Sequence, residues 1–128
     1  MLNYDPENAP NPKDWLELDK QQRLRMIELY LDREGGYGGS LQRQASIHAI
    51  VETQLAESIT PVKAAFMRLR DNGVSRHEAV RTIGSILADC MPQAVRSGDV
   101  GAALNKEYLA KLEVLTADTR LERSREKS

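Results

Sequence analysis

Apolar residues recur every three or four positions along five stretches of this chain, which is the spacing of one face of an α-helix. In the first stretch, Leu24, Ile27 and Leu31 follow this spacing and predict a helix over residues 20–34. The segment 35–39 ends that helix, because four glycines in five positions carry a large entropy cost inside any regular element. We therefore expect a glycine-rich linker between two helices.

The other four stretches predict helices over residues 41–58, 60–71, 75–91 and 104–115. Ser40 and Thr60 suit the N-cap position, and Ser75 with Glu78 forms an S-x-x-E capping box. Gly73 suits the left-handed residue that often follows the end of a helix. Two further N-caps are expected, at Asn11 and at Asp19 with Gln22 three residues on.

No stretch shows the sustained alternation of a β-strand, so the sequence predicts an all-α fold, a compact bundle of about five helices. Residues 20–116 are expected to form a single helical domain. Residues 1–19 contain three prolines and predict an extended arm with a short turn, anchored by Trp15. Residues 117–128 are mostly charged and predict a frayed tail.

The charge balance and the cysteine count narrow the expected partners. Eighteen Lys and Arg against nineteen Asp and Glu give a net charge of −1, which argues against a whole-surface nucleic-acid binder. Cys90 is the only cysteine, so one chain can form neither a disulfide nor a cysteine-based zinc site. No segment has the pattern of a membrane span or a secretion signal, so we expect a cytoplasmic protein without a membrane partner.

The two histidines offer the most distinctive chemistry. His48 and Glu52 lie four residues apart on one helix face, and His77 lies on another helix expected to contact the core. These three side chains could converge on one divalent metal ion. We prefer the alternative that both histidines are hydrogen-bonded at the edge of the core and that Glu52 binds Arg76 or Arg81.

Two other classes of function have less support. The segment around Gly73 could form a helix-turn-helix whose second helix presents Arg76, Arg81 and Thr82 to DNA bases, but the balanced charge argues against it. Cys90 lies on an apolar stripe and resembles a buried structural thiol. No catalytic residue is therefore expected.

Parts of the sequence resemble an uncharacterised family of small bacterial all-helical proteins, a domain of unknown function. The resemblance lies in an IHxIVE motif at residues 47–52 and an RHEAxxxIG motif at residues 76–84. Residues 3–6, residues 15–19 and positions within 108–116 fit it as well.

The resemblance implies a side-chain cluster between two antiparallel helices, with further histidines where this chain has Gln44 and Arg81. With four histidines, that cluster would be a metal or proton-linked site, but this chain keeps only two of them and a positive charge at Arg81 disfavours a cation, so the departure from the family pattern favours a hydrogen-bonded core cluster over a metal site. The members of that cluster would be Gln44, His48, Glu52, His77 and Arg81. Gly84, one turn beyond Arg81, would let the two helices approach closely.

These patterns favour a non-catalytic helical protein, a protein-interaction or ligand-binding module. Its partner is expected to be a protein, which could be a second copy of this chain. The second interpretation is a divalent-metal-binding protein that uses His48, Glu52 and His77, and the third is a helix-turn-helix DNA binder.

Overall fold

The computed structural model describes residues 4–35, 40–98 and 104–119. The expected glycine-rich linker and most of the expected charged tail lie outside these ranges. The helices are α1 (Pro12–Glu17), α2 (Lys20–Glu34), α3 (Leu41–Ala56), α4 (Thr60–Asp71), α5 (Arg76–Cys90), α6 (Pro92–Ser97) and α7 (Lys106–Glu113). The described residues contain no β-strand, which confirms the all-α fold.

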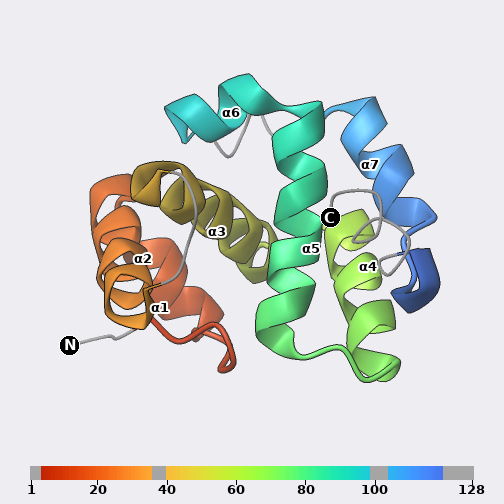
Figure 1. Ribbon diagram of the computed structural model, residues 1–128, viewed down its shortest axis with the longest axis horizontal. Coiled ribbons are helices and arrows are strands. Elements are labelled where there is room, and N and C mark those ends of the chain that lie inside the picture. Colours follow the sequence, from red (N-terminus) through yellow and green to blue (C-terminus); the bar gives the residue numbers. More distant parts are fainter. Residues whose placement is uncertain (1–3, 36–39, 99–103, 120–128) are drawn as a thin grey trace.

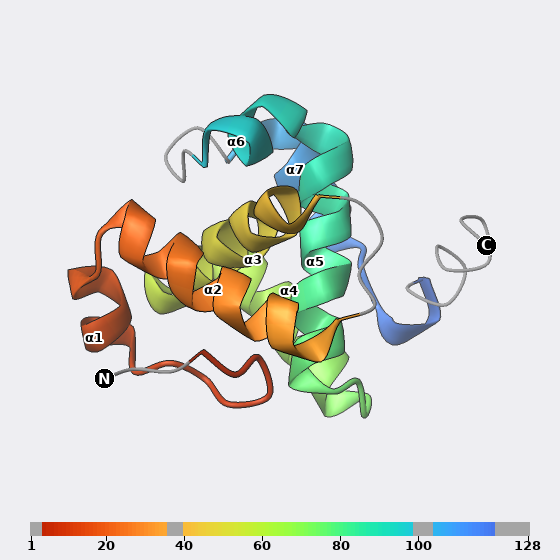
Figure 2. The ribbon, with the colours of Figure 1, turned by 60° about the vertical axis from the view of Figure 1, so that its left-hand side comes forward.

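Helix α3 lies in the middle of the molecule. α1 and α2 lie on one side of it and α4, α5 and α7 on the other, with α6 above the end of α5 (Figure 1). Figure 2 shows α2 lying alongside α3. Every residue from position 45 to position 54 is buried, so this part of α3 has no solvent face. That burial requires apolar or paired side chains on all sides of the helix.

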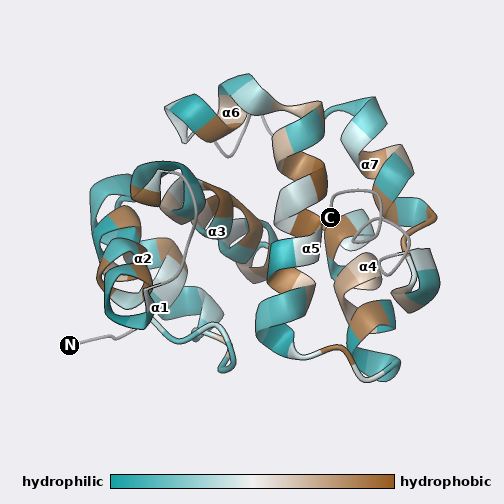
Figure 3. Ribbon diagram, in the orientation of Figure 1, coloured by the Kyte–Doolittle hydropathy of each residue, from teal (hydrophilic) through white to brown (hydrophobic). Residues whose placement is uncertain are grey.

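Two hydrophobic clusters meet on α3. The smaller cluster joins Tyr4, Trp15, Ile27 and Leu31 to Ala45 and Ala49 of α3. The larger cluster joins Ile47, Ile50 and Val51 of α3 to buried residues of α4, α5, α6 and α7. The inner faces of these helices are accordingly the apolar ones (Figure 3). α3 therefore belongs to both halves of the core.

Polar side chains fix most of the helix starts as expected. Four predicted N-caps are confirmed, because Asn11, Asp19, Ser40 and Ser75 each accept a hydrogen bond from a backbone N–H of the first turn. The predicted cap at Thr60 was wrong, since Ile59 occupies the N-cap of α4 and Thr60 is already helical. Pro61 then lies in the first turn, where its missing N–H has no helical partner to lose.

The short helix α6 was not indicated by the apolar pattern. It spans Pro92–Ser97, which is too short for a sustained periodicity to appear. Pro92 begins it with a preset backbone angle, and Gly98 ends it in the left-handed conformation. Ser46 fastens it to α3 by donating its hydroxyl hydrogen to the carbonyl of Val95 at 2.5 Å.

Helices α3 and α5 cross closely at Gly84. A Cβ atom at this position would collide with Cγ2 of Ile47, so only a glycine fits this crossing as it stands. The predicted close approach at Gly84 is thus confirmed. On α3 this crossing lies at Ile47, next to His48, and on α5 it lies about two turns from His77, so it sets how near the polar residues of the two helices come.

Candidate functional site

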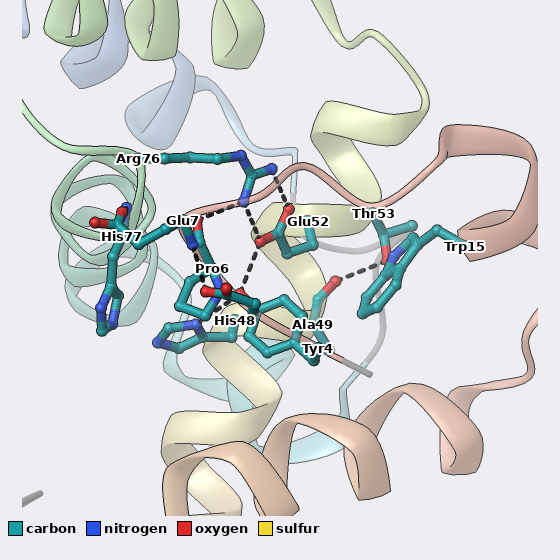
Figure 4. Close-up of polar contacts among 11 residues, drawn as sticks. Tyr4, Pro6, Glu7, Trp15, His48, Ala49, Glu52, Thr53, Arg76 and His77 are labelled. Atoms are coloured by element: carbon teal, nitrogen blue, oxygen red, sulfur yellow. Dashed lines mark hydrogen bonds and ion pairs between the residues drawn. The ribbon is translucent and has the colours of Figure 1, made fainter. Parts of the chain in front are cut away.

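A buried ion pair between α3 and α5 forms the centre of the polar cluster (Figure 4). Arg76 Nη1 donates to Glu52 Oε2 at 2.8 Å, and Nη2 donates to Oε1 at 2.7 Å. Only 2% of Glu52 and 7% of Arg76 is exposed. The paired, two-bond geometry makes such burial tolerable. Of the two partners expected for Glu52, the structure confirms Arg76.

Tyr4 connects this ion pair to His48. The Tyr4 hydroxyl donates to Glu52 Oε2 at 2.7 Å, and its oxygen lies 3.1 Å from His48 Nδ1. An ionised carboxylate can only accept, so the single hydroxyl proton points to Glu52. His48 Nδ1 must then carry the proton of the other bond, which leaves Nε2 of the neutral ring as an acceptor.

The side chains of His48 and Tyr4 are both neutral near pH 7. Burial lowers the pKa of His48 from 6.5 to about 3, and electrostatic interactions with His77, Arg81 and Arg76 act in the same direction. Burial also raises the pKa of Tyr4 well above its ordinary value, followed by the effect of the neighbouring Glu52 carboxylate. The directions of the hydrogen bonds between Tyr4, His48 and Glu52 therefore hold across the neutral range.

The N-terminal arm covers this cluster. The carbonyl of Pro6 accepts from Arg76 Nη1 at 2.9 Å, and the Glu7 carboxylate accepts from the backbone N–H of His77 at 2.6 Å. Tyr4 and Pro6 are themselves buried. The arm is thus a structural part of the site.

Trp15 was the only anchor of the arm that the sequence indicated. Its indole N–H donates to Thr53 Oγ1 at 3.0 Å, and its ring is buried, as expected. Tyr4 and Pro6 were missed, because their partners lie 44 to 70 positions away and such contacts leave no local pattern. The one available signal was a tyrosine two positions before a proline in an otherwise mostly polar segment.

The same contacts bear on the three-ligand metal interpretation. Both Glu52 oxygens are occupied, by Tyr4 and by Arg76. The rings of His48 and His77 lie beside each other, with centroids 5.7 Å apart. Among the residues that the structure describes, however, no three His, Cys, Asp or Glu side chains are placed to hold a metal ion. Burial is the main cause of the low pKa of His48, and the guanidinium groups of Arg81 and Arg76, which lower it further, would also oppose a cation.

Gln44 and Arg81 lie apart from Glu52. The side chain of Arg81 is 53% exposed, and its Nη1 donates to Glu78 Oε1 at 3.3 Å. Together with His48, Gln44 and Arg81 instead line a pocket of about 210 Å³ between α3 and α5. The expected five-residue cluster therefore divides into a buried part around Glu52 and an open part at this pocket.

The face of α5 that would read DNA is turned inward. Arg76 is buried against Glu52, and Thr82 is buried with its hydroxyl donating to the carbonyl of Glu78 at 2.8 Å. Of the three expected base-contacting residues, only Arg81 is exposed. The DNA-binding interpretation was thus wrong for Arg76 and Thr82, because packing against α3 and α4 takes that face of α5.

Cys90 is only half-buried, so the expectation of a buried thiol was wrong in degree. Burial still raises the pKa of the thiol. A raised pKa reduces the thiolate form, which is the nucleophile. The surroundings of Cys90 therefore do not activate it.

A second recess, called the groove below, lies between the arm, α1, α3 and α4. It has a volume of about 340 Å³ and includes the Glu52–Arg76 pair in its lining. The large apolar side chains of its wall are Trp15, Leu55, Phe66 and Met67, and the charged ones on its α4 side are Lys63, Arg70 and Asp71. Size and lining are those of a site for an apolar group.

Comparison of the chain with protein-family models, curated protein sequences and solved structures finds no match. The chain is a small all-helical protein, and its resemblance to a bacterial helical family rests on the motifs alone. No helix within the described ranges is long and apolar enough to cross a membrane.

Proposed function

We propose that this protein is a non-catalytic interaction module whose groove binds an apolar side chain from an acidic segment of a partner protein. The groove itself is the observation that carries this proposal. Its volume of about 340 Å³ accommodates one large aliphatic or aromatic side chain with part of its neighbours. Binding of protein partners commonly centres on one such anchor in a pocket.

Met67 extends the apolar surface beyond the groove. It is 49% exposed, so about half of its apolar surface remains in contact with water. Methionine adapts its shape to a partner, because its side chain is unbranched and polarisable. A partner segment that continues past its anchor would cover the exposed part of Met67 as well as the part that lines the groove.

The rim of the groove favours an acidic partner. Lys63 and Arg70 are exposed there, with Asp71 as the single opposing exposed charge. The Glu52 carboxylate deeper in the groove is already paired with Arg76. A local excess of positive charge, in a chain whose net charge is −1, steers acidic segments toward this face and disfavours basic ones.

The wall of the groove is held in place before binding. The guanidinium of Arg76 lies over the Phe66 ring, 5.5 Å from its centroid, while its nitrogens bind Glu52. On the opposite wall, the Trp15 indole is fixed by its bond to Thr53. A preformed site loses little side-chain entropy on binding, which favours affinity from a small contact area.

Trp15 allows the proposal to be tested directly. It is the only tryptophan of the chain and it lines the groove, so its fluorescence should report occupancy. The probe is a short peptide with one central leucine between glutamates, and the controls are the same peptide with lysines or with serine in place of leucine. We expect saturable binding of the first peptide alone. No response to it, or equal binding of the lysine peptide, would overturn the proposal.

Charge reversal on the rim tests the site. Lys63→Glu with Arg70→Glu should weaken binding about tenfold, at roughly 0.7 kcal/mol for each rim charge. Lys106→Glu is the matched control, because Lys106 is exposed on α7 and outside the groove lining. An unchanged affinity in the double variant would show that the rim charges do not select an acidic partner. Concentration-dependent dimerisation through Met67 without peptide binding would show that the groove binds a second copy of the chain, and either result would overturn the proposal.

We also infer that the protein is cytoplasmic and related to the bacterial helical family named above. Support comes from the two motifs, residues 47–52 and 76–84, whose histidines and charged residues build the cluster between α3 and α5.

A further inference from the structure

The pocket between α3 and α5 contains a hydrogen-bond acceptor that the fold itself holds in place. Because the Tyr4 hydroxyl proton goes to Glu52, His48 keeps its proton on Nδ1 and its Nε2 is a bare lone pair. His48 is 1% exposed, and it is one of the residues that line the pocket. The low pKa of this imidazole keeps it an acceptor throughout the neutral range.

The rest of the pocket lining is mostly polar, with Ile47 and Ala88 as its apolar members. It contains two guanidinium groups, those of Arg43 and Arg81, against the one carboxylate of Asp89, and Arg81 also contacts Glu78 outside the lining at 3.3 Å. The Gln44 amide adds donors, and the pocket volume of about 210 Å³ suits a small ion with a few water molecules. Arginine binds oxyanions through paired N–H donors, so a small oxyanion is the ligand class that this lining fits best.

The acceptor at His48 adds a second requirement. A fully deprotonated oxyanion would place an oxygen lone pair against the lone pair of Nε2, which is repulsive and leaves the buried acceptor unsatisfied. We propose that this pocket binds a small oxyanion that still carries a proton, of the hydrogen phosphate class, with its O–H donated to His48 Nε2 and its charged oxygens bound by Arg81 and Arg43. The site is separate from the groove and does not depend on the proposed function.

The imidazole of His77, next to that of His48, contains a buried nitrogen atom, Nε2, without a hydrogen-bond partner within the described residues. Its ring lies next to that of His48, at 5.7 Å between centroids (Figure 4). A native protein rarely leaves such an atom unpaired, so a water molecule is expected to reach His77 Nε2, although His77 is not itself one of the residues that line the pocket.

Phosphate and sulfate separate this proposal from a plain electrostatic site. Both ions are tetrahedral oxyanions, but near neutral pH phosphate keeps a proton and sulfate keeps none. In calorimetric titrations at matched ionic strength, phosphate should bind at least about tenfold more tightly than sulfate, because only phosphate can satisfy Nε2. Equal binding of the two ions, which indicates an adventitious ion only, or no binding of phosphate, would overturn the proposal. Methyl phosphate in the same titration distinguishes the free ion from a monoester.

Two variants assign the binding to these residues. Arg81→Gln should lose most of the phosphate affinity, while Arg25→Gln, an exposed position of α2 outside the pocket, should keep it. Tyr4→Phe should reduce the preference for phosphate over sulfate, because Tyr4 does not line the pocket and acts on it by fixing the proton on His48 Nδ1. Tyr4 also donates to Glu52, so urea unfolding must show that the variant is folded. Nitrogen NMR of the unliganded protein should show that proton directly. A proton on Nε2, or an Arg81→Gln variant that is folded and binds phosphate normally, would contradict the proposal.

Discussion

The Glu52 carboxylate is the residue around which the polar interior is organised. It is buried on α3 and accepts hydrogen bonds from the Tyr4 hydroxyl and from two nitrogens of Arg76. Removing a charge from water costs several kcal/mol, which only a partner of opposite charge and good geometry offsets. The pair therefore adds little stability by itself, but each member depends strongly on the other.

Replacing Arg76 by methionine tests this dependence. Methionine keeps much of the side-chain volume but leaves Glu52 charged, buried and without its partner, so the free energy of unfolding at neutral pH should fall by about 3–5 kcal/mol. Adding Glu52→Gln should recover more than half of that loss. Urea unfolding measures both variants. A single variant within about 1 kcal/mol of the parent would show that Glu52 finds another partner or takes up a proton at little cost.

His48 makes stability depend on pH. Its pKa is about 3 in the folded protein against an ordinary value of 6.5, so between these values the unfolded chain binds a proton that the folded protein excludes. The free energy of unfolding should therefore fall with falling pH below 6.5, by up to about 1.4 kcal/mol per pH unit. His48→Gln lacks this contribution. Urea unfolding at about pH 6 and about pH 5 should show the parent losing about 1 kcal/mol more than the variant; equal losses would refute it.

At the scale of elements, the crossing of α3 and α5 determines how the two halves of the polar cluster meet. Gly84 permits this crossing, because any side chain there would collide with Ile47. An alanine at Gly84 would improve intrinsic helix propensity by about 1 kcal/mol, so propensity and packing oppose each other at this position. Packing should prevail, since a well-packed core does not yield easily to an added methyl group.

Gly84→Ala should therefore lower the free energy of unfolding by about 2 kcal/mol, despite the better helix former. In an Ile47→Ala background the colliding atom is absent, and the same substitution should become neutral or stabilising. Thermal and urea unfolding of the four proteins give this comparison. An equal cost in both backgrounds would mean that Ile47 is not the obstacle.

Local signals account for what could be predicted at this scale. Asp19 with Gln22 forms its predicted capping box, and the close approach at Gly84 follows from one glycine among apolar neighbours. The Glu52–Arg76 pair was one of two open alternatives, because helix spacing says which residues share a face but not which face meets which. The contacts that Tyr4 makes could not be predicted, because a segment without periodicity gives no information on which distant residues it contacts.

At the scale of the whole molecule, α3 joins the two hydrophobic clusters. Ala45 and Ala49 pack in the smaller cluster, while Ile47, Ile50 and Val51 pack in the larger one. Neither cluster can lose α3 without exposing the buried side chains of the other. The two are thus expected to unfold together as one cooperative unit.

Two probes can check this cooperativity. Trp15 fluorescence reports the smaller cluster, and far-UV circular dichroism reports the helices of both. The two urea transitions should coincide in the parent, and in Arg76→Met both midpoints should shift to lower urea together. A Trp15 transition that precedes the loss of helix would mean that the arm, α1 and α2 detach first.

The contact of Pro6 with Arg76 also constrains how the protein folds while it is being synthesised. The two residues lie 70 positions apart, so at ribosomal rates of about 5–20 residues per second the arm is synthesised roughly 4–14 s before its partner emerges. During that interval Tyr4 can already contact α2 and α3, where its partners in the smaller cluster and His48 and Glu52 lie, but the carbonyl of Pro6 has no partner. The arm can therefore complete its docking only after the start of α5 has emerged, and a nascent chain halted before α5 should expose its N-terminus to proteases more than the full chain does.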